Sequence, residues 1–499
     1  MMNDIRRGAA ILGLCLAATI FTAAQEAVKL TVKWDKVVGV SRTHPSLQVV
    51  VNPKLRRDSP IHKQAFQALK DLKADYVRFV PWYPYPRLGV AELEPPANGK
   101  TSWDFSLIDP MMVDFLEAAG DRPVVLNFST VPQWMFDTGN KSYYPANPNE
   151  EFWAYSYGEK LRDPSMKELS AYYSRLLQWY TKGGFTDEFG KKHSSGHRYK
   201  IGYWEVFNEP EFEHNISPED YTARYDAIVG AMRRVDPALK FVGVSLAYPA
   251  KQPRFFEYFL NPKNHKPGIP LDMISYHFYA QPAGDQPVGS HQYTMFDQAD
   301  KFIDVVRYIE SIRKRLSPKT RTSINEIGSI LPDDINQGEK GKTYRTEEYW
   351  NVSGAMFAYL YVELAKQGIE VLNESQLVGF PGQFPSVTML DWETGKPNAR
   401  YQVLKLLIDN FRPPAKMLDT ELKTPSVAAQ AFIDEQGRKK ILLINKRDRD
   451  AEIDIEGIVN GSLQIVRHGR DNIAVEKIGQ NKVRLGGFAV AVVTMPDKN

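Results

Sequence analysis

The segment Val206-Phe207-Asn208-Glu209-Pro210 places an amide and a carboxylate side by side at the end of a strand-like run. The amide of Asn208 can both donate and accept hydrogen bonds, which suits contact with a sugar hydroxyl. Pro210 disfavours helical geometry in the residue before it, so we expect Glu209 to be extended at the tip of the strand. The alternative is that Glu209 only caps the helix that follows.

A second glutamate occupies a similar position further along the chain. Arg321–Asn325 is a short β-prone run, Glu326 follows it, and Gly328 opens the next turn. Glu209 and Glu326 are far enough apart to come from different strands of one sheet and to face one pocket. Glycoside hydrolysis requires such a pair: one carboxyl group donates a proton to the leaving oxygen, and the other attacks or stabilises the anomeric carbon.

Other titratable residues near these glutamates fit structural roles better. Glu205 lies inside the predicted strand, where we expect a buried, paired carboxylate, and Glu211 also flanks the motif. The nine histidines show no His-x-x-x-His spacing on a helix, so no metal site is expected. Chemistry by two glutamates needs no cofactor.

These residues sit within an alternation of strand-like and helix-like segments between residues 36 and 412. Helical spacing of apolar residues marks Lys301–Arg313, a segment starting near Phe66 and another ending at Phe411. This order predicts a parallel sheet covered by helices, and its length favours a closed (β/α)₈ barrel. An open doubly wound sheet is the alternative, but no Gly-rich nucleotide loop follows the first strand. The strand candidates are residues 76–80, 123–128, 203–207, 241–244, 273–276 and 322–325.

The pattern changes after Arg412-Pro413-Pro414. Short β-prone runs separated by turns predict a small, sandwich-like all-β domain over residues 413–499. A strand within residues 25–35, near Val28–Trp34, could pair with that domain. The strand candidates are residues 426–433, 440–445, 451–455, 463–467, 482–485 and 490–495.

With these motifs in place, the chain resembles glycoside hydrolase clan A, and most closely family 39, which includes β-xylosidases and α-L-iduronidases. The Asn-Glu-Pro stretch is the most specific match, and the others follow in order along the predicted barrel. The loop at residues 379–386 does not match the family, so the resemblance supports mechanism better than substrate. The matching stretches are GVSRTHP (39–45), YVRFVPW (76–82), NFSTVPQW (127–134), YWEVFNEP (203–210), ISYHFY (274–279), SINE (323–326) and MLDWETGKPNARY (389–401).

The resemblance implies a role for each matching residue. Glu209 would be the acid/base at the fourth strand and Glu326 the nucleophile at the seventh, acting with retention through a covalent glycosyl-enzyme. Asn208 would hold the sugar 2-hydroxyl, and Arg78 on the second strand would keep Glu326 ionised. The remaining expected substrate contacts are His277 and Tyr279 after the sixth strand, then Trp134, and less strongly Trp82, Trp392 and His44.

The first residues of the chain point to an exported protein. Residues 1–24 combine a basic start with an apolar run and small residues at Thr22-Ala23-Ala24, which is typical of a secretory signal. We therefore expect a periplasmic or secreted protein; an uncleaved membrane anchor is the alternative. The only cysteine, Cys15, lies in this segment, so the mature chain would contain no thiol. The net charge of +3 and the lack of a long basic run argue against a nucleic-acid partner.

The function expected from the sequence is thus hydrolysis of an oligo- or polysaccharide. One rival is a catalytically inactive glycan-binding protein on the same barrel, which the presence of both glutamates disfavours. Another is an open-sheet hydrolase with a serine nucleophile, which the absence of a Gly-x-Ser-x-Gly sequence disfavours. The sequence leaves open the sugar, exo or endo action and the oligomeric state.

Overall fold

The computed structural model describes residues 27–139, 143–155, 158–335, 346–470 and 472–496. The expected signal segment, residues 1–24, and Cys15 lie outside the described residues. Within the described ranges, no helix is long and apolar enough to cross a membrane.

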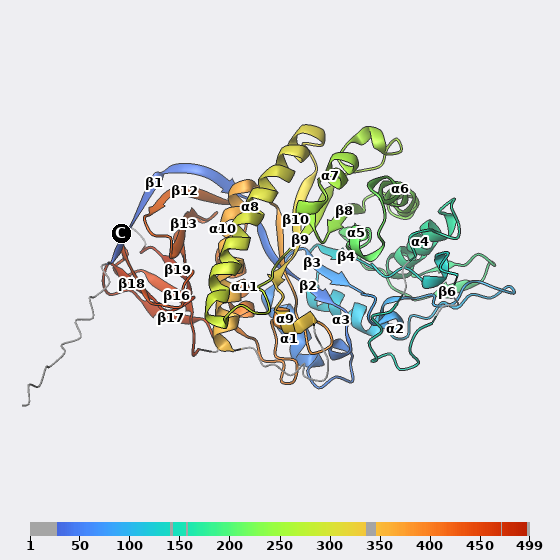
Figure 1. Ribbon diagram of the computed structural model, residues 1–499, viewed down its shortest axis with the longest axis horizontal. Coiled ribbons are helices and arrows are strands. Elements are labelled where there is room, and N and C mark those ends of the chain that lie inside the picture. The colour runs from blue at the N-terminus through green and yellow to red at the C-terminus, as the bar shows by residue number, and fades with distance from the viewer. Residues whose placement is uncertain (1–26, 140–142, 156–157, 336–345, 471, 497–499) are drawn as a thin grey trace, which may run out of the picture.

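A closed barrel of eight parallel strands forms the larger part of the molecule, as the sequence predicts (Figure 1). Around the barrel the strands follow chain order, so the carboxyl ends of all of them meet at one rim. The strands are β2 (His44–Val50), β3 (Val77–Val80), β4 (Val124–Leu126), β7 (Tyr203–Glu205), β8 (Lys240–Leu246), β9 (Met273–Ala280), β10 (Arg321–Ser329) and β11 (Val371–Glu374).

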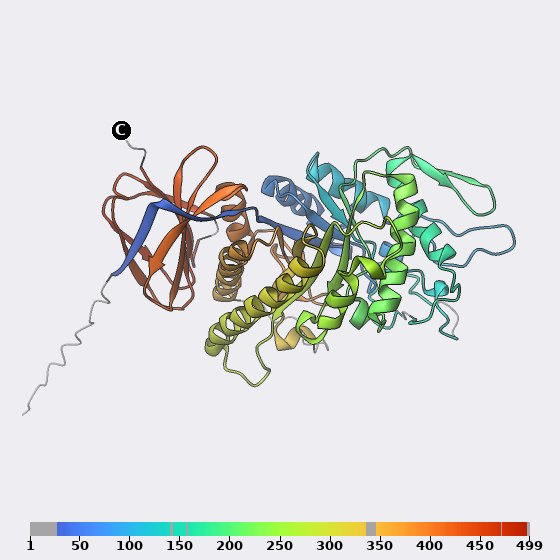
Figure 2. The same cartoon turned by 90° about the horizontal axis from the view of Figure 1, so that it is seen from above.

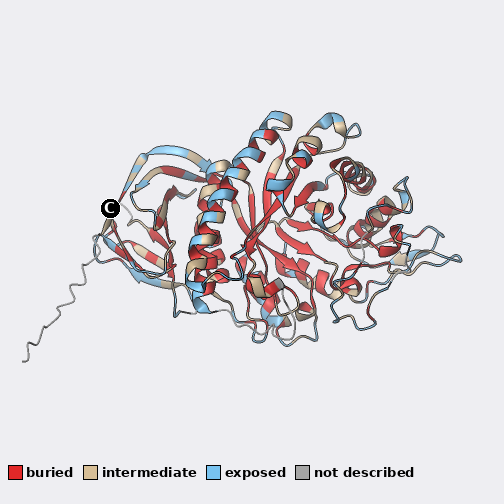
Figure 3. Cartoon of the chain, in the orientation of Figure 1, coloured by how far each residue is buried: buried red, intermediate tan, exposed pale blue. Residues whose placement is uncertain are grey.

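Helices surround this barrel and bury their apolar faces against it (Figure 3). Side-chain caps mark several helix starts: Ser217 accepts from the backbone of Asp220, and Thr346 from that of Tyr349. The larger helices are α1 (His62–Leu72), α3 (Asp109–Ala119), α4 (Lys167–Thr181), α6 (Pro218–Val235), α7 (Pro253–Phe259), α8 (His291–Leu316), α10 (Glu347–Gln367) and α11 (Ala399–Asn410).

Shorter elements connect the barrel units. The hairpin of β5 (Gly184–Thr186) and β6 (Lys192–Ser194) lies between α4 and β7. The short α-helices are α2 (Pro86–Gly89), α5 (Pro210–Glu213) and α9 (Pro332–Ile335). The 3₁₀ turns are η1 (Pro53–Leu55), η2 (Gln133–Met135), η3 (Pro249–Lys251), η4 (Pro262–Asn264), η5 (Val288–Ser290) and η6 (Pro385–Val387).

The remaining strands form a separate all-β unit beside the barrel. In this nine-stranded sheet, β1 (Val28–Ser41) lies between β12 and β15, antiparallel to the first and parallel to the second. Figure 2 shows β1 running from this sheet into the barrel. The other strands are β12 (Ala415–Leu422), β13 (Val427–Ile433), β14 (Lys439–Asn445), β15 (Ala451–Ile455), β16 (Ser462–Val466), β17 (Ala474–Lys477), β18 (Lys482–Leu485) and β19 (Val490–Thr494).

The barrel and the sheet share an apolar interface. Helices α10 and α11 pack against β14, β16 and β19, and the barrel's hydrophobic core continues into these strands. The rings of Phe411 and Phe432 have centroids 4.6 Å apart across the interface. Lys440 also crosses it, donating from Nζ to the backbone oxygen of Asn410 at 3.2 Å. The β unit therefore covers apolar surface on two barrel helices.

Candidate active site

A cavity of about 1120 Å³ opens at the carboxyl ends of the barrel strands. Its walls come from loops after nearly every strand, and six residues expected from the sequence line it: Trp82, Asn208, Glu209, His277, Tyr279 and Glu326. Residues far apart in the sequence thus meet in one pocket, at the rim where barrel enzymes carry their active sites.

Glu209 follows β7, where the chain turns sharply into α5. Its φ of 43° and ψ of 52° are left-handed, so the expected extended conformation is wrong. The turn lets the Glu209 carbonyl accept from the backbone N–H groups of Phe212 at 2.9 Å and Glu213 at 2.7 Å. The side chain makes no cap bond to α5; instead its Oε1 lies 2.9 Å from Nδ1 of His277. A strained backbone held by its surroundings is common at functional sites.

Glu326 lies within β10, where the sequence analysis places it just after the strand. A bulge between Ile324 and Glu326 shifts the register against β9. Successive strand residues normally point to opposite faces, but a bulge re-aims a side chain. Both Asn325 and Glu326 consequently face the barrel interior: Asn325 donates to Glu205 at 2.7 Å, while Glu326 lines the cavity.

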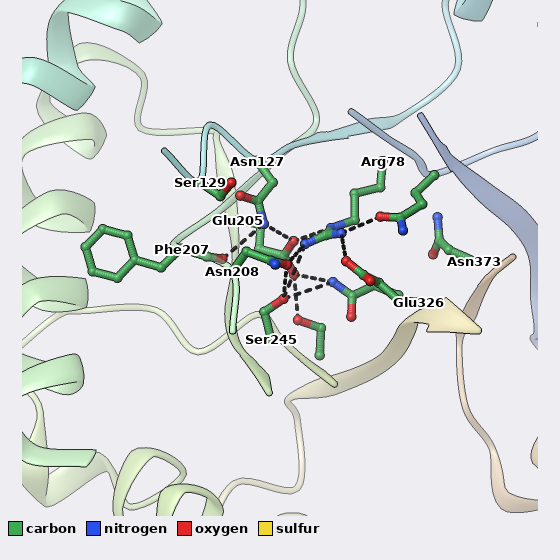
Figure 4. Close-up of polar contacts among 12 residues, drawn as sticks. Arg78, Asn127, Ser129, Glu205, Phe207, Asn208, Ser245, Glu326 and Asn373 are labelled. Atoms are coloured by element: carbon green, nitrogen blue, oxygen red, sulfur yellow. Dashed lines mark hydrogen bonds and ion pairs between the residues drawn. The ribbon is translucent and has the colours of Figure 1, made fainter. Parts of the chain in front are cut away.

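Arg78 on β3 connects the polar residues beneath the cavity (Figure 4). It is fully buried, and its Nε donates to Glu205 at 2.5 Å. Its Nη1 donates to Gln48 and to Glu326, both at 2.6 Å, and its Nη2 donates to Asn208 Oδ1 at 2.6 Å. One guanidinium thus fixes the relative positions of four side chains, including Glu326 and Asn208.

Glu205 is a buried carboxylate of the barrel core, in keeping with the structural role expected for it. Besides Arg78, it accepts hydrogen bonds from Asn127 at 2.5 Å, Ser275 at 2.5 Å and Asn325 at 2.7 Å. These donors satisfy both of its oxygens, and Glu205 does not line the cavity. Its hydrogen bond with Arg78 Nε fixes the guanidinium on the side away from the cavity.

The surroundings of Glu326 favour its ionised form. Burial acts to raise the pKa of Glu326, but the charges of His277 and Arg78 and hydrogen bonds from Tyr279 and Arg78 outweigh it, so the pKa lies below its usual range. Tyr279 donates from its hydroxyl to Glu326 Oε2 at 2.6 Å. Glu326 is therefore a carboxylate near neutral pH.

His277 lies between the two glutamates. Its Nδ1 is 2.9 Å from Glu209 and 3.6 Å from Glu326 Oε2, and its Nε2 is 3.1 Å from the hydroxyl of Ser245. Burial alone would lower the pKa of His277, but both carboxylates raise it above its usual value. One oxygen from each glutamate and a ring nitrogen of His277 lie within 4.8 Å of one another. These donor types would also suit a divalent cation.

Three aromatic residues expected to contact sugar lie outside the cavity lining. His44 begins β2 at the opposite end of the barrel, where it pairs with Asp75 at 3.3 Å. Trp134 is buried in the core, with the Arg162 guanidinium 4.4 Å from its ring. Trp392 is also part of the hydrophobic core. Other side chains of the protein surround these three residues.

Aromatic residues that the sequence analysis did not assign form two cavity walls. Trp82, which was expected, packs against Trp153 and Phe384, with ring centroids 5.4 and 6.0 Å away. On another side of the cavity, Phe212 and Tyr248 are 5.9 Å apart and are 57% and 41% exposed. Exposed rings in a cavity offer flat apolar surfaces to a ligand.

The model of glycosyl hydrolases family 39 matches residues 19–327, more than half of the chain, and includes both glutamates. No curated protein matches the sequence.

Solved structures with similar folds include several glycosidases. The GH51 arabinofuranosidase from Xanthomonas axonopodis pv. citri has a TM-score of 0.66 at 12% identity, over 94% of this chain and 100% of that one. A monomeric beta-xylosidase from Caulobacter crescentus CB15 has a TM-score of 0.61 at 15% identity, over 95% and 100%. A glucosidase from Croceicoccus marinus has a TM-score of 0.61, also at 15% identity, over 95% and 100%. At these identities the likeness concerns the fold.

Proposed function

The chain belongs to glycosyl hydrolase family 39 and is a glycoside hydrolase; we propose that it cleaves O-glycosidic bonds of an oligo- or polysaccharide with retention of configuration. In this proposal Glu326 is the nucleophile and Glu209 the general acid and base. The carrying observation is that an oxygen of each lies within 4.8 Å of the other. Retaining enzymes hold their carboxyl groups about 5–5.5 Å apart, whereas inverting enzymes need about 6.5–9.5 Å to admit a water.

The environments of the two glutamates support these roles. Glu326 is held ionised by Arg78, His277 and Tyr279, as a carboxylate that attacks the anomeric carbon must be. Among the described residues, Arg78 donates no hydrogen bond to Glu209, and the Glu209 side chain is 15% exposed. It can therefore exchange protons with a leaving group or a water in the cavity.

The reaction would proceed in two steps. A Glu326 oxygen bonds to the anomeric carbon while the glycosidic oxygen leaves with the proton of Glu209. Glu209, now ionised, then takes a proton from water, whose oxygen attacks the same carbon and releases Glu326. Each step inverts the carbon, so the two together retain its configuration.

Substrate binding would use the remaining cavity residues. Asn208 would hold the sugar 2-hydroxyl, and the walls containing Trp153 and Tyr248 would pack against sugar rings. A screen of aryl glycosides of xylose, arabinose, glucose, mannose and uronic acids would identify the sugar. We also propose export to the periplasm or the medium, based on residues 1–24. Detection of a mature chain starting near Gln25 in those fractions would test this.

The alternative is an inactive glycan-binding protein. The observation against it is that both glutamates are present and their hydrogen-bonding partners are in place, with Glu326 held by Arg78 and Tyr279. Absence of turnover on every glycoside, together with glycan binding, would favour this alternative.

Glycoside turnover with and without azide tests the two roles. Glu326→Ala should be nearly inactive on every substrate, because no intermediate forms. Glu209→Ala should still form the intermediate from a substrate with an activated aryl leaving group, but water would attack it slowly. Azide should then restore turnover and give a glycosyl azide with the configuration of the substrate. An inverted azide from Glu209→Ala, or rescue only in Glu326→Ala, would show that the roles are reversed.

A further inference from the structure

Glu213 connects two substrate-facing side chains through one oxygen atom. Its Oε1 accepts a hydrogen bond from Asn208 Nδ2 at 2.9 Å and another from Trp82 Nε1 at 2.8 Å. Glu213 is the last residue of α5, the single turn that begins directly after Glu209. Its other oxygen, Oε2, is buried and has no hydrogen-bond partner among the described residues. Among the described residues, the Glu213 carboxyl group therefore forms its side-chain hydrogen bonds through Oε1.

The first contact determines which way the Asn208 amide points. Arg78 can only donate hydrogen bonds, and its Nη2 donates to Asn208 Oδ1 at 2.6 Å. Glu213 Oε1 accepts from Nδ2 of the same amide, so Arg78 and Glu213 both require the same orientation of the Asn208 side chain. One of the two Nδ2 hydrogens is used by Glu213. The other remains for a ligand, so a sugar hydroxyl meets a donor and acts as the acceptor.

The second contact holds the Trp82 ring in the cavity wall. The indole N–H is the only polar group of tryptophan, and Glu213 engages it. Trp82 therefore offers ring surface to a ligand, together with Trp153 and Phe384. Without this acceptor, the indole N–H would be left partly buried and unpaired, and the ring would lose its polar anchor.

We propose that Glu213 is a positioning residue, which fixes the Asn208 amide and the Trp82 ring for sugar binding beside Glu209. The proposal rests on the glycosidase function proposed above and adds a residue that acts through two others. Its signature is a dependence on the sugar 2-hydroxyl, because one of its two effects passes through Asn208.

The charge on Glu213 also bears on Glu209. Burial raises the pKa of Glu213 well above its usual value, and the negative charge of Glu209 raises it further, while hydrogen bonds from Asn208 and Trp82 act against both. Its surroundings therefore favour the neutral form of the Glu213 carboxyl group. A neutral anchor accepts the same two hydrogen bonds without placing a second negative charge beside the acid/base.

Kinetics of three variants test this role. Glu213→Leu has a similar volume but no acceptor, whereas Glu213→Gln keeps an acceptor oxygen and is always neutral. Glu211→Gln is the matched control: Glu211 lies on the same turn but accepts from the backbone of Tyr248 instead. The substrates are the best aryl glycoside from the screen and its 2-deoxy counterpart, and thermal melting of each variant reports folding.

Glu213→Leu should lower kcat/KM on the parent glycoside by about tenfold or more. The loss on the 2-deoxy substrate should be clearly smaller, while Glu213→Gln stays within about threefold of wild type and Glu211→Gln is unchanged. Equal losses on both substrates, or a Gln variant as poor as Leu with an unchanged melting temperature, would overturn the proposal. If Glu213→Leu does not fold, Glu213→Ala replaces it. If wild type and Glu211→Gln were both inactive on every glycoside, that result would instead refute the proposed function.

Discussion

Replacing Tyr279 with Phe removes one hydroxyl from the site and should alter the pH dependence of catalysis. The Tyr279 hydroxyl donates to Glu326 Oε2 at 2.6 Å and lies 2.7 Å from Ser375 Oγ. Burial and the charge of Glu326 raise the pKa of Tyr279 well above its usual value. The hydroxyl therefore keeps its proton, and stabilises the Glu326 carboxylate, throughout the working pH range.

The size of the effect follows from the charge on the acceptor. A hydrogen bond to a charged group contributes about 1.5–3 kcal/mol, and about 1.4 kcal/mol corresponds to a factor of ten. The bond favours ionised Glu326, so its loss raises the pKa of Glu326 and moves the acid limb of kcat/KM to higher pH. On the acid side of that limb, Tyr279→Phe should retain about one tenth of wild-type kcat/KM or less. Near neutral pH the loss should be smaller.

The assay is kcat/KM for an aryl glycoside between about pH 4 and 9, bracketing the usual carboxyl and histidine ranges. Tyr276→Phe is a matched control on the same strand, because the Tyr276 hydroxyl is buried with no hydrogen-bond partner among the described residues. It should leave the acid limb in place. An unmoved acid limb in Tyr279→Phe, or an equal change in both variants, would refute the account of how Glu326 is kept ionised.

Two further predictions concern the cavity wall and the β unit. Trp153→Ala should raise KM by roughly five- to tenfold with a smaller change in kcat, because the residue is 39% exposed in the cavity wall. His44→Ala, at the other end of the barrel, serves as the control. Equal KM changes in the two variants would show that Trp153 does not contact the substrate. Phe432→Ala should lower the free energy of unfolding by about 3–5 kcal/mol, since its buried ring packs on Phe411. Deleting residues 415–499 should yield an insoluble or less stable barrel; a soluble barrel of unchanged melting temperature would show that the β unit has no structural role.

Strands with a regular apolar pattern could be predicted from the sequence, including four that carry or precede site residues, whereas strands interrupted by polar or charged residues could not. Six barrel strands match the predicted runs, but β2 and β11 were not among them. Strand β2 carries buried Ser46 and Gln48 among its apolar residues, which obscures the pattern of a parallel strand. Gln48 is polar because it faces Arg78 inside the barrel. In the β unit, β12 and β17 were missed because charged residues interrupt their apolar pattern.

That Glu209 and Glu326 face one cavity could be predicted from the sequence, while the side chains that position them depend on distant contacts. Glu213 resembles an ordinary helix-surface acid in sequence, and one of its hydrogen bonds comes from Trp82, which follows β3 and is distant in the chain. The bulge that turns both Asn325 and Glu326 inward leaves no mark in the sequence. The left-handed turn at Glu209 contradicts the usual preference of a residue before proline. Such features result from the assembled barrel.

The route of β1 has a consequence for the order in which the molecule can assemble during synthesis. This strand is made first among the described elements, yet Leu30 pairs with Leu422 and Val28 with Ile453, which leave the ribosome after the whole barrel. Until then β1 has no partner, although it continues almost directly into the first barrel strand. Pairing between such distant segments forms late, and an unpaired strand is open to wrong contacts meanwhile. A nascent chain released before β12 would thus expose that strand, even with Glu209 and Glu326 already made.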